Sequence, residues 1–244
     1  MKRTLILLCA AWCAFNPISA QDHTTHPSQF FLRYDETPSS LRLIPTPPAD
    51  SSARFAYDRE QYEWGKTLRD TPRGTLAVSD ATLSKEWVND VFGEAFGFEI
   101  TPEKAPELCR LLENMRQDAG DLSTREAKNH YKRTRPFVYW DEPTATPSHE
   151  AFLRTNGSYP SGHTAIGWAS ALVLAEINPA RATEILKRGY EFGQSRVIVG
   201  AHYQSDVDMG RIVSAGVVAA LHANPDFEKQ LKKAKKEFKR MSKR

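Results

Sequence analysis

Cysteine is scarce in this sequence, with three residues among 244, and two of them, Cys9 and Cys13, lie within the first 20 residues. If that segment is removed, Cys109 is the only cysteine left, so an intramolecular disulfide is excluded and the core must stabilise the fold. Glycine and proline, at 13 and 15 residues, are too few for a collagen or low-complexity chain. With 40% apolar and 26% charged residues, the composition is that of a soluble globular protein.

Long apolar runs are also few. The run over residues 5–15 follows Lys2 and Arg3, and it is shorter than the roughly 20 apolar residues of a membrane-spanning helix. Residues 18–20 (Ile-Ser-Ala) have the small-residue pattern of a cleavage site. We therefore predict a cleaved secretory signal peptide over residues 1–20, in preference to a membrane anchor.

An excess of charge of one sign is missing as well. Residues 1–20 hold two of the 33 basic side chains, so 31 remain against 30 acidic ones, which argues against a general nucleic-acid binder. The basic residues are unevenly placed, because residues 226–244 hold nine of them and three acidic residues. Leu231 and Phe238 lie two helical turns apart there, which favours a solvated amphipathic helix. A tail that attaches the protein to anionic surfaces is the alternative.

Strand-like alternation is scarce, whereas apolar residues recur at helical spacing along most of the chain. This pattern predicts an all-α fold, a single-domain helical bundle over residues 53–228. Residues 21–52 contain five prolines and little periodicity, so we expect an extended surface arm without core residues. Residues 229–244 form the basic C-terminal helix or tail.

Several helices carry their own boundary signals. Apolar residues at four-residue spacing predict a helix over residues 81–96. Thr101, followed by proline, is typical of a helix start. Ser123 with Glu126 three residues later forms a capping box, and the helix it opens should end at Pro136.

Two further segments have a composition that suits central helices. Residues 164–175 are apolar nearly all round, and residues 210–223 are rich in glycine, alanine, serine and valine. Small residues let helix backbones approach closely, so we expect both at the centre of the bundle. Each run is too short to span a membrane.

Three short segments concentrate polar side chains, and the first contains Lys128 and Arg135. A separation of seven residues returns to nearly the same face of an α-helix, so both cations could address one anion. A proline follows Arg135, so this guanidinium could project from a helix end into a pocket. The alternative is a solvated basic face, because Lys132 and Arg133 lie between them.

In the second segment, Pro160, Ser161, Gly162 and His163 lead into the apolar helix that begins near Thr164. Glycine permits close backbone approach, and a helix N-terminus presents N–H groups and a partial positive charge to an anion. An ordinary capping turn with a packed histidine is the alternative.

The third segment contains Arg196, His202 and Asp206. Asp206 follows His202 by four residues, within reach of one imidazole nitrogen, which would fix the tautomer and leave the other nitrogen free to attack. Arg196 adds a planar donor suited to phosphate. A helix cap with a surface ion pair is the alternative.

Together these segments supply three cations, a helix N-terminus and two histidines. Phosphoryl transfer through a covalent intermediate needs this set, because it requires charge neutralisation on the phosphoryl oxygens, a nucleophile and a proton donor.

The order and spacing of these motifs, from Lys128 to Asp206, resemble the three-part signature of the type 2 phosphatidic acid phosphatase (PAP2) superfamily, which includes acid phosphatases, lipid phosphatases and vanadium haloperoxidases. The string GSYPSGHT at residues 157–164, the export signal and the chain size are similar to the class A bacterial non-specific acid phosphatases. The general resemblance extends from about Leu41 to the C-terminus.

The resemblance implies a role for each motif residue. His202 would be the nucleophile that forms a phosphohistidine, with Asp206 holding its other nitrogen, and His163 would be the general acid and then the base that activates water. No metal and no cofactor are expected. The residues expected to bind the phosphoryl oxygens are Lys128, Arg135, Ser161, Gly162 and Arg196.

The implied protein is a periplasmic, metal-independent acid phosphatase acting on nucleotides, sugar phosphates and aryl phosphates, with phosphotransfer to alcohols as a side activity. The resemblance also suggests a homo-oligomer, without nucleic-acid binding or stable membrane insertion. Because His202 must be neutral and His163 protonated, we expect an optimum on the acid side, and a profile peaking above about pH 8 would count against His163 as the acid.

Three alternatives remain. A vanadium haloperoxidase would use the same cradle for vanadate, and a halide oxidation assay with added vanadate separates it from a phosphatase. A lipid phosphatase is disfavoured because no membrane spans follow the signal. A secreted binding protein would use the basic tail, and deletion of residues 229–244 would test it.

Overall fold

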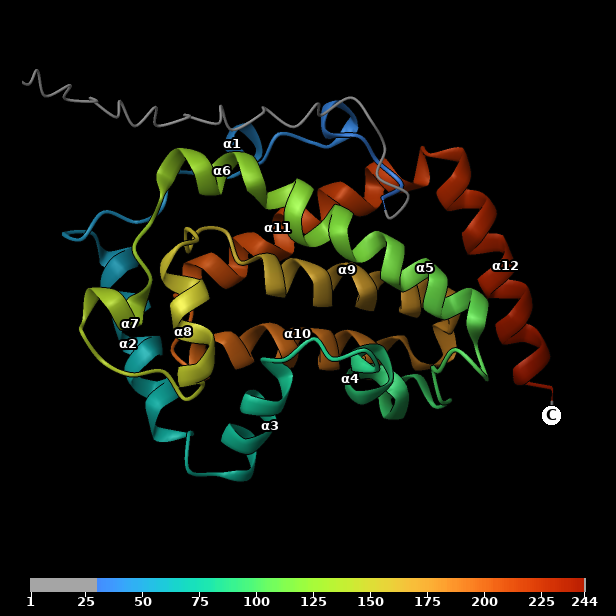
Figure 1. Cartoon of the computed structure of the whole chain (residues 1–244), viewed down its shortest axis with the longest axis horizontal. Coiled ribbons are helices and arrows are strands. Elements are labelled where there is room, and N and C mark those ends of the chain that lie inside the picture. The colour runs from blue at the N-terminus through green and yellow to red at the C-terminus, as the bar shows by residue number, and fades with distance from the viewer. Residues whose placement is uncertain (1–29, 244) are drawn as a thin grey trace, which may run out of the picture.

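The computed structural model describes residues 30–243, and that part of the chain consists of helices and the loops between them (Figure 1). The predicted all-α class is confirmed. The predicted signal peptide and residues 21–29 of the arm lie outside the described residues. Within residues 30–243, no helix is long and apolar enough to cross a bilayer. In chain order the helices are η1 (Tyr34–Glu36), α1 (Ser40–Leu43), α2 (Ala53–Thr67), α3 (Pro72–Asp80), α4 (Trp87–Phe96), α5 (Pro106–Gln117), η2 (Asp118–Leu122), α6 (Ser123–Tyr131), α7 (Pro136–Tyr139), α8 (Pro147–Arg154), α9 (Gly162–Ile177), η3 (Pro179–Arg181), α10 (Ala182–Ile198), α11 (Gln204–His222) and α12 (Pro225–Met241).

Helix α9 lies at the centre of the bundle, because small and apolar residues cover nearly all of its sides. It packs most extensively on α10 and α11, and Figure 1 shows it between α5 and α10. The close approach depends on glycine, since a Cβ on Gly167 would lie 2.2 Å from the ring of Phe192 in α10. The prediction of two central helices is confirmed: residues 164–175 lie within α9, and residues 210–222 form the C-terminal part of α11.

Helices α5 and α6 are continuous through η2, a π-helical turn. Ser123 therefore has no free helix terminus to cap, and its hydroxyl donates to the Ala119 carbonyl one turn earlier. Glu126 accepts a hydrogen bond from the Ser39 hydroxyl instead. The predicted capping box is wrong, because the residues before Ser123 are already helical.

The helix predicted over residues 81–96 begins later, at Trp87. Helix α3 ends at Asp80, whose carboxylate pairs with Arg188 and accepts a hydrogen bond from the Ser195 hydroxyl at 2.6 Å. These contacts fix the end of α3 against α10, and the chain turns before α4 begins.

The start of α5 is also displaced, from the predicted Thr101 to Pro106. The first N–H groups of α5, those of Glu107 and Leu108, donate to the carboxylate of Glu237 in α12 at 3.1 and 3.0 Å. A carboxylate from a distant helix thus does the capping that the local sequence assigns to Thr101.

The described part of the N-terminal arm contributes to the core, contrary to the sequence prediction. Phe31 and Leu32 are buried in the main hydrophobic cluster. Their backbone N–H groups donate to the Asp118 carboxylate at 3.1 and 3.0 Å, and the Phe31 ring lies edge-on to that of Phe227 at 5.4 Å. The arm is held because η2 presents a buried acceptor and α12 presents an apolar face.

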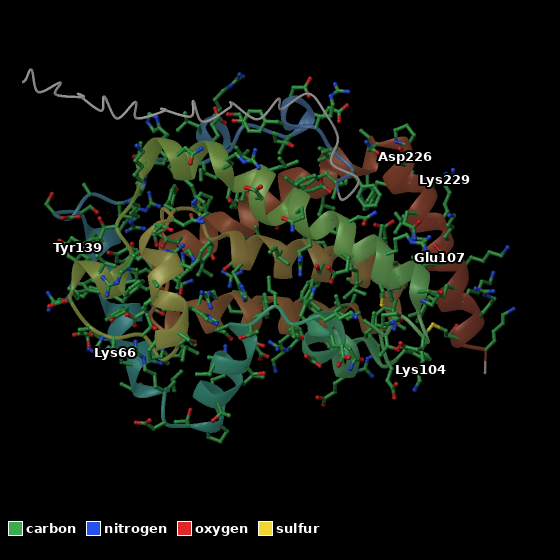
Figure 2. All side chains as sticks on the ribbon, viewed as in Figure 1. Lys66, Lys104, Glu107, Tyr139, Asp226 and Lys229 are labelled. Carbon is green, nitrogen blue, oxygen red and sulfur yellow. The ribbon has the colours of Figure 1, made fainter. Side chains whose placement is uncertain are left out.

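The predicted amphipathic C-terminal helix is α12, which begins at Pro225 and packs on α5. Leu231 and Ala234 are buried against the bundle, whereas Lys229 and most of the other lysines are exposed. Figure 2 shows Lys229 at one end of the molecule and Lys66 and Tyr139 at the other.

Candidate active site

A cavity of about 400 Å³ lies where the three polar segments meet. It is bounded by α6, the start of α9, the end of α10 and the loop before α11. Two predicted site residues, Ser161 and Asp206, are fully buried and do not line it. The predicted residues that line the cavity are Lys128, Arg135, Gly162, His163, Arg196 and His202.

Lys128 and Arg135 converge for a different reason from the one predicted. Helix α6 ends at Tyr131, and Lys132 takes a left-handed backbone conformation with φ 44°. Arg135 lies in extended backbone, and Pro136 begins α7 instead of ending the helix before it. The prediction of one shared helical face is wrong, because a reversal of the chain, not helical periodicity, brings both cations to the cavity.

His202 is oriented by contacts at both ring nitrogens. Its Nδ1 lies 3.2 Å from Asp206 Oδ2, and its Nε2 lies 2.9 Å from Arg135 Nη1. A guanidinium only donates, so Nε2 carries the lone pair and Nδ1 carries the proton that is donated to Asp206. Burial and the nearby Arg135 lower the pKa of His202 well below its usual value, which favours the neutral imidazole.

Asp206 remains ionised although it is fully buried. Burial acts to raise its pKa, but the Arg133 guanidinium, 2.6 Å away, and hydrogen bonds with His202 and Ser158 outweigh burial and hold the pKa well below its usual range. The Tyr203 N–H donates to the same carboxylate at 2.9 Å. The His202 ring therefore faces a fixed negative charge on its Nδ1 side.

Arg133 is a site residue that the sequence analysis missed, because its neighbours made a solvated basic face plausible. The side chain is 9% exposed and bridges Asp206 to Asp58, whose Oδ2 lies 2.8 Å from Arg133 Nη2. Its guanidinium also lies over the Tyr203 ring, 3.9 Å from the centroid. No local signal marks Asp58, which reaches this position from α2 and is fully buried.

The three predicted cations of the cavity differ in how their donors are used. Arg135 is buried, and its Nε and Nη1 donate to the backbone carbonyls of Leu153 and Ala201 at 2.8 and 3.0 Å. Arg196 is also buried, yet its Nε and Nη1 have no partner in the described part of the chain. Unpartnered buried donors are costly unless a ligand satisfies them, so Arg196 marks a place for an anion.

Burial and mutual repulsion change the pKa values of these cations. Burial, followed by Arg135, lowers the pKa of Lys128 to about 7, and the same two causes lower the pKa of Arg196 to about 9. An anion in the cavity relieves both repulsions. The arrangement therefore favours a ligand with several negative charges over a neutral one.

The second histidine of the cavity, His163, is the second residue of α9. Its Nε2 lies 2.7 Å from the Asp80 carbonyl, and its ring stacks on Phe192 with centroids 4.4 Å apart. A carbonyl only accepts, so Nε2 carries a proton and Nδ1 is the nitrogen left for proton transfer. Burial and then Arg196 lower the pKa of His163 well below its usual value.

The protein alone therefore favours neutral His163, whereas the sequence analysis expects the protonated form. The negative charges of a phosphate ester act in the opposite direction and raise the pKa of a neighbouring imidazole. Asp80, which holds His163 through its backbone carbonyl, is a third residue, after Arg133 and Asp58, that the sequence did not reveal.

Ser161 and Gly162 form the start of α9. The Ser161 hydroxyl oxygen accepts hydrogen bonds from the backbone N–H and the hydroxyl of Thr164 at 3.2 and 2.9 Å, which makes it the N-cap. A Cβ on Gly162 would lie 2.6 Å from the Gly120 carbonyl of η2, so only glycine fits. Gly162 thus brings the N-terminus of α9 to the cavity, whereas Ser161 is fully buried and does not line the cavity.

Among residues 30–243, no group of three or more histidine, cysteine, aspartate and glutamate side chains is arranged to hold a metal ion. Besides the two histidines and the three cations described above, the ionisable side chains that line the cavity are Arg116, Asp121 and His149.

Known proteins share these features. Residues 119–229 match the model of the PAP2 superfamily. The chain is 51% identical to the non-specific acid phosphatase of Providencia stuartii, with 100% of both chains covered. It is 43% identical to the non-specific acid phosphatase of Salmonella typhimurium, over 92% of this chain and 90% of that protein. An acid phosphatase of Zymomonas mobilis is 37% identical, over 91% of this chain and 82% of its own length.

Proposed function

The chain belongs to the class A bacterial non-specific acid phosphatases of the PAP2 superfamily, and from this we propose that it hydrolyses phosphate monoesters through a phosphohistidine on His202. The observation that carries the proposal is the pair of unpartnered, buried donors on Arg196, in a cavity that His202 also lines. A phosphoryl group bound by these donors shares the cavity with His202, whose Nδ1–H is already directed at Asp206.

In the first step, Lys128, Arg135 and Arg196 bind the non-bridging oxygens, together with the N–H groups at the start of α9. When Arg135 Nη1 turns from His202 Nε2 to a phosphoryl oxygen, the released Nε2 lone pair attacks phosphorus, and the bond from phosphorus to the leaving oxygen breaks. The proton on Nδ1 stays on the ring, and Asp206 stabilises the positive charge that develops there. A preorganised carboxylate at 3.2 Å supports this role.

His163 acquires a proton on Nδ1 when substrate binds and gives it to the leaving oxygen in the first step, so this nitrogen is unprotonated when the second step begins. The same nitrogen then accepts a proton from water as the water oxygen attacks phosphorus and the P–N bond breaks. His202 and inorganic phosphate are regenerated. An alcohol that replaces water in this step receives the phosphoryl group, which gives the proposed phosphotransferase activity.

The depressed pKa of His202 supports activity on the acid side of neutrality. Because its pKa lies well below the usual value, the nucleophile stays neutral as the pH falls through the range where an ordinary histidine becomes protonated. Free Lys128, with a pKa of about 7, loses its charge as the pH rises through that value, which weakens anion binding at alkaline pH.

The test is hydrolysis of p-nitrophenyl phosphate at about pH 5 to 7 in the presence of EDTA. We expect turnover by the wild type, none by His202→Ala, and wild-type rates for His130→Ala, whose exposed side chain lies outside the cavity. Turnover that survives His202→Ala would refute the proposed nucleophile. EDTA-sensitive turnover would refute the metal-independent mechanism.

We also propose export to the periplasm with cleavage after Ala20, and assembly into a homo-oligomer. N-terminal sequencing of the exported protein tests the first, with Gln21 as the expected first residue. Light scattering of the purified protein tests the second, and a monomeric mass would contradict it.

A further inference from the structure

A second cavity of about 660 Å³ adjoins the candidate active site. The two cavities share Lys128 and Arg135 as walls, so a molecule bound to these cations can extend into either. Phe152 also lines both, and 68% of its surface is exposed. The catalytic steps proposed above do not use this second cavity.

The lining of the second cavity is strongly basic. Besides the two shared cations it contains Arg125, Lys132, Arg133 and Arg154, against Asp121 as the one acidic residue of the lining. Arg125 and Asp121 form an ion pair, so their charges cancel. Arg133 is neutralised by its two buried carboxylates. The excess positive charge therefore comes from Lys132 and Arg154.

Lys132 is held close to Lys128 by the fold. Its backbone N–H donates to the Lys128 carbonyl at 3.0 Å, and its left-handed conformation ends α6 at this point. Within residues 30–243 its exposed ammonium has no ion pair with a carboxylate. Its charge is available to a ligand.

Arg154 is positioned by an aromatic ring more than by its carboxylate. Its guanidinium lies over the Phe137 ring, 4.9 Å from the centroid, whereas the contact with Glu150 is a long 3.5 Å, with the Arg154 side chain 49% exposed and that of Glu150 17% exposed. A long ion pair with one half-exposed partner contributes little. A phosphate group in the cavity competes with Glu150 at low cost.

We propose that this cavity binds a second phosphate group of the substrate while the first phosphate occupies the site next to His202. The ligand class is small bisphosphorylated molecules, such as nucleoside or sugar bisphosphates, and Phe152 contacts the ring that links the two phosphates. The proposal rests on the proposed function, since it takes Lys128, Arg135 and Arg196 as the site of the first phosphate.

The second phosphate does not take part in the chemical step. It contributes equally to the bound substrate and to the transition state, so it lowers KM without changing kcat. The same reasoning predicts a strong dependence on ionic strength for bisphosphates, because the contacts are partly exposed.

The experiment compares adenosine 3′,5′-bisphosphate with AMP. Calorimetry on the His202→Ala protein measures the two dissociation constants without turnover, and steady-state phosphate release by otherwise wild-type protein measures KM and kcat. We expect the bisphosphate to bind roughly tenfold more tightly than AMP, which is the scale of an additional charge-assisted contact. Lys132→Glu and Arg154→Glu, singly and together, should abolish this difference and leave AMP binding within about twofold.

Lys187→Glu is the matched control, because it reverses an exposed lysine on α10 outside both cavities. It should leave the preference for the bisphosphate unchanged. Equal dissociation constants for the two ligands, or a preference that survives Lys132→Glu with Arg154→Glu, would overturn the subsite. Failure of the proposed function is a separate result, an absence of AMP and p-nitrophenyl phosphate hydrolysis by the wild type.

Discussion

Replacement of Arg133 by methionine should destabilise the protein and slow the enzyme together. Arg133 contacts two carboxylates that are fully buried, Asp58 at 2.8 Å and Asp206 at 2.6 Å. Methionine has a similar volume but no charge, so both carboxylates lose their guanidinium partner. Their remaining hydrogen bonds come from Ser158, Tyr203, His202 and Ser205.

The size of the effect follows from the cost of an uncompensated buried charge. Removal of one partner from a buried ion pair costs about 3 to 5 kcal/mol in free energy of unfolding. For a chain of this size, each kcal/mol shifts Tm by roughly 2 to 4 °C, so Arg133→Met should lower Tm by roughly 6 to 20 °C. Double-mutant cycles are needed because the two carboxylates share one partner.

The loss of stability in Arg133→Met should depend on pH. Burial already raises the pKa of Asp58 with Arg133 in place, and removal of the cation raises it further. A group whose pKa is higher in the folded protein than in the unfolded chain reduces stability as the pH rises through that range. Arg133→Met should therefore be destabilised more at about pH 7 than at about pH 5.

Thermal unfolding followed by circular dichroism measures the Tm of Arg133→Met, of Asp58→Asn and of the double variant at both pH values. Asp58→Asn should recover part of the Tm lost in Arg133→Met, because an amide does not carry the unpaired charge. The reasoning is refuted if Arg133→Met lowers Tm by less than about 2 °C, or if Asp58→Asn adds to the loss instead of reducing it.

Three further predictions concern the cavity. Arg196→Met should lower kcat/KM for p-nitrophenyl phosphate by roughly 100- to 1000-fold and leave Tm equal or higher, because its Nε and Nη1 are unpartnered in the described chain; a large loss of Tm would contradict the assignment. Lys128→Arg should shift the alkaline limb of the kcat/KM profile upward from near the Lys128 pKa of about 7, since arginine keeps its charge there; an unchanged limb would show that another group titrates. Phe152→Ala should raise KM for p-nitrophenyl phosphate several-fold and leave KM for glycerol phosphate unchanged, because the exposed ring can contact only substrates with an apolar leaving group; equal changes for both substrates would remove this contact.

The parts of the site that the sequence predicted are those whose geometry is local. Asp206 reaches His202 because the two residues are four apart on the entry to α11. Ser161 and Gly162 begin α9 because a capping residue directly precedes an apolar helix. In both places the neighbouring residues alone determine the backbone, so spacing along the chain translates into distance in space.

The parts that could not be predicted depend on contacts between distant segments. Asp58 and Asp80 come from α2 and α3, far from the motifs in sequence, and a buried carboxylate in an amphipathic helix has no local mark. Helix α5 begins where the Glu237 carboxylate caps it, and the sequence of residues 101–105 does not indicate that contact. The sequence predicts that Lys128 and Arg135 address one site, and both line the cavity, but nothing local marks the chain reversal at Lys132 that brings them together.

The most direct measurement of the central claim is the site of phosphorylation in a trapped intermediate. His163→Ala should bind p-nitrophenyl phosphate and accept the phosphoryl group, because this leaving group needs little protonation, but it lacks the base that activates water. Rapid mixing, alkaline quenching and mass spectrometry of the peptides should then find phosphohistidine at His202. The account predicts near-stoichiometric phosphate on His202 and none in His163→Ala combined with His202→Ala. Turnover without a phosphoenzyme, or phosphate on another residue, would contradict it.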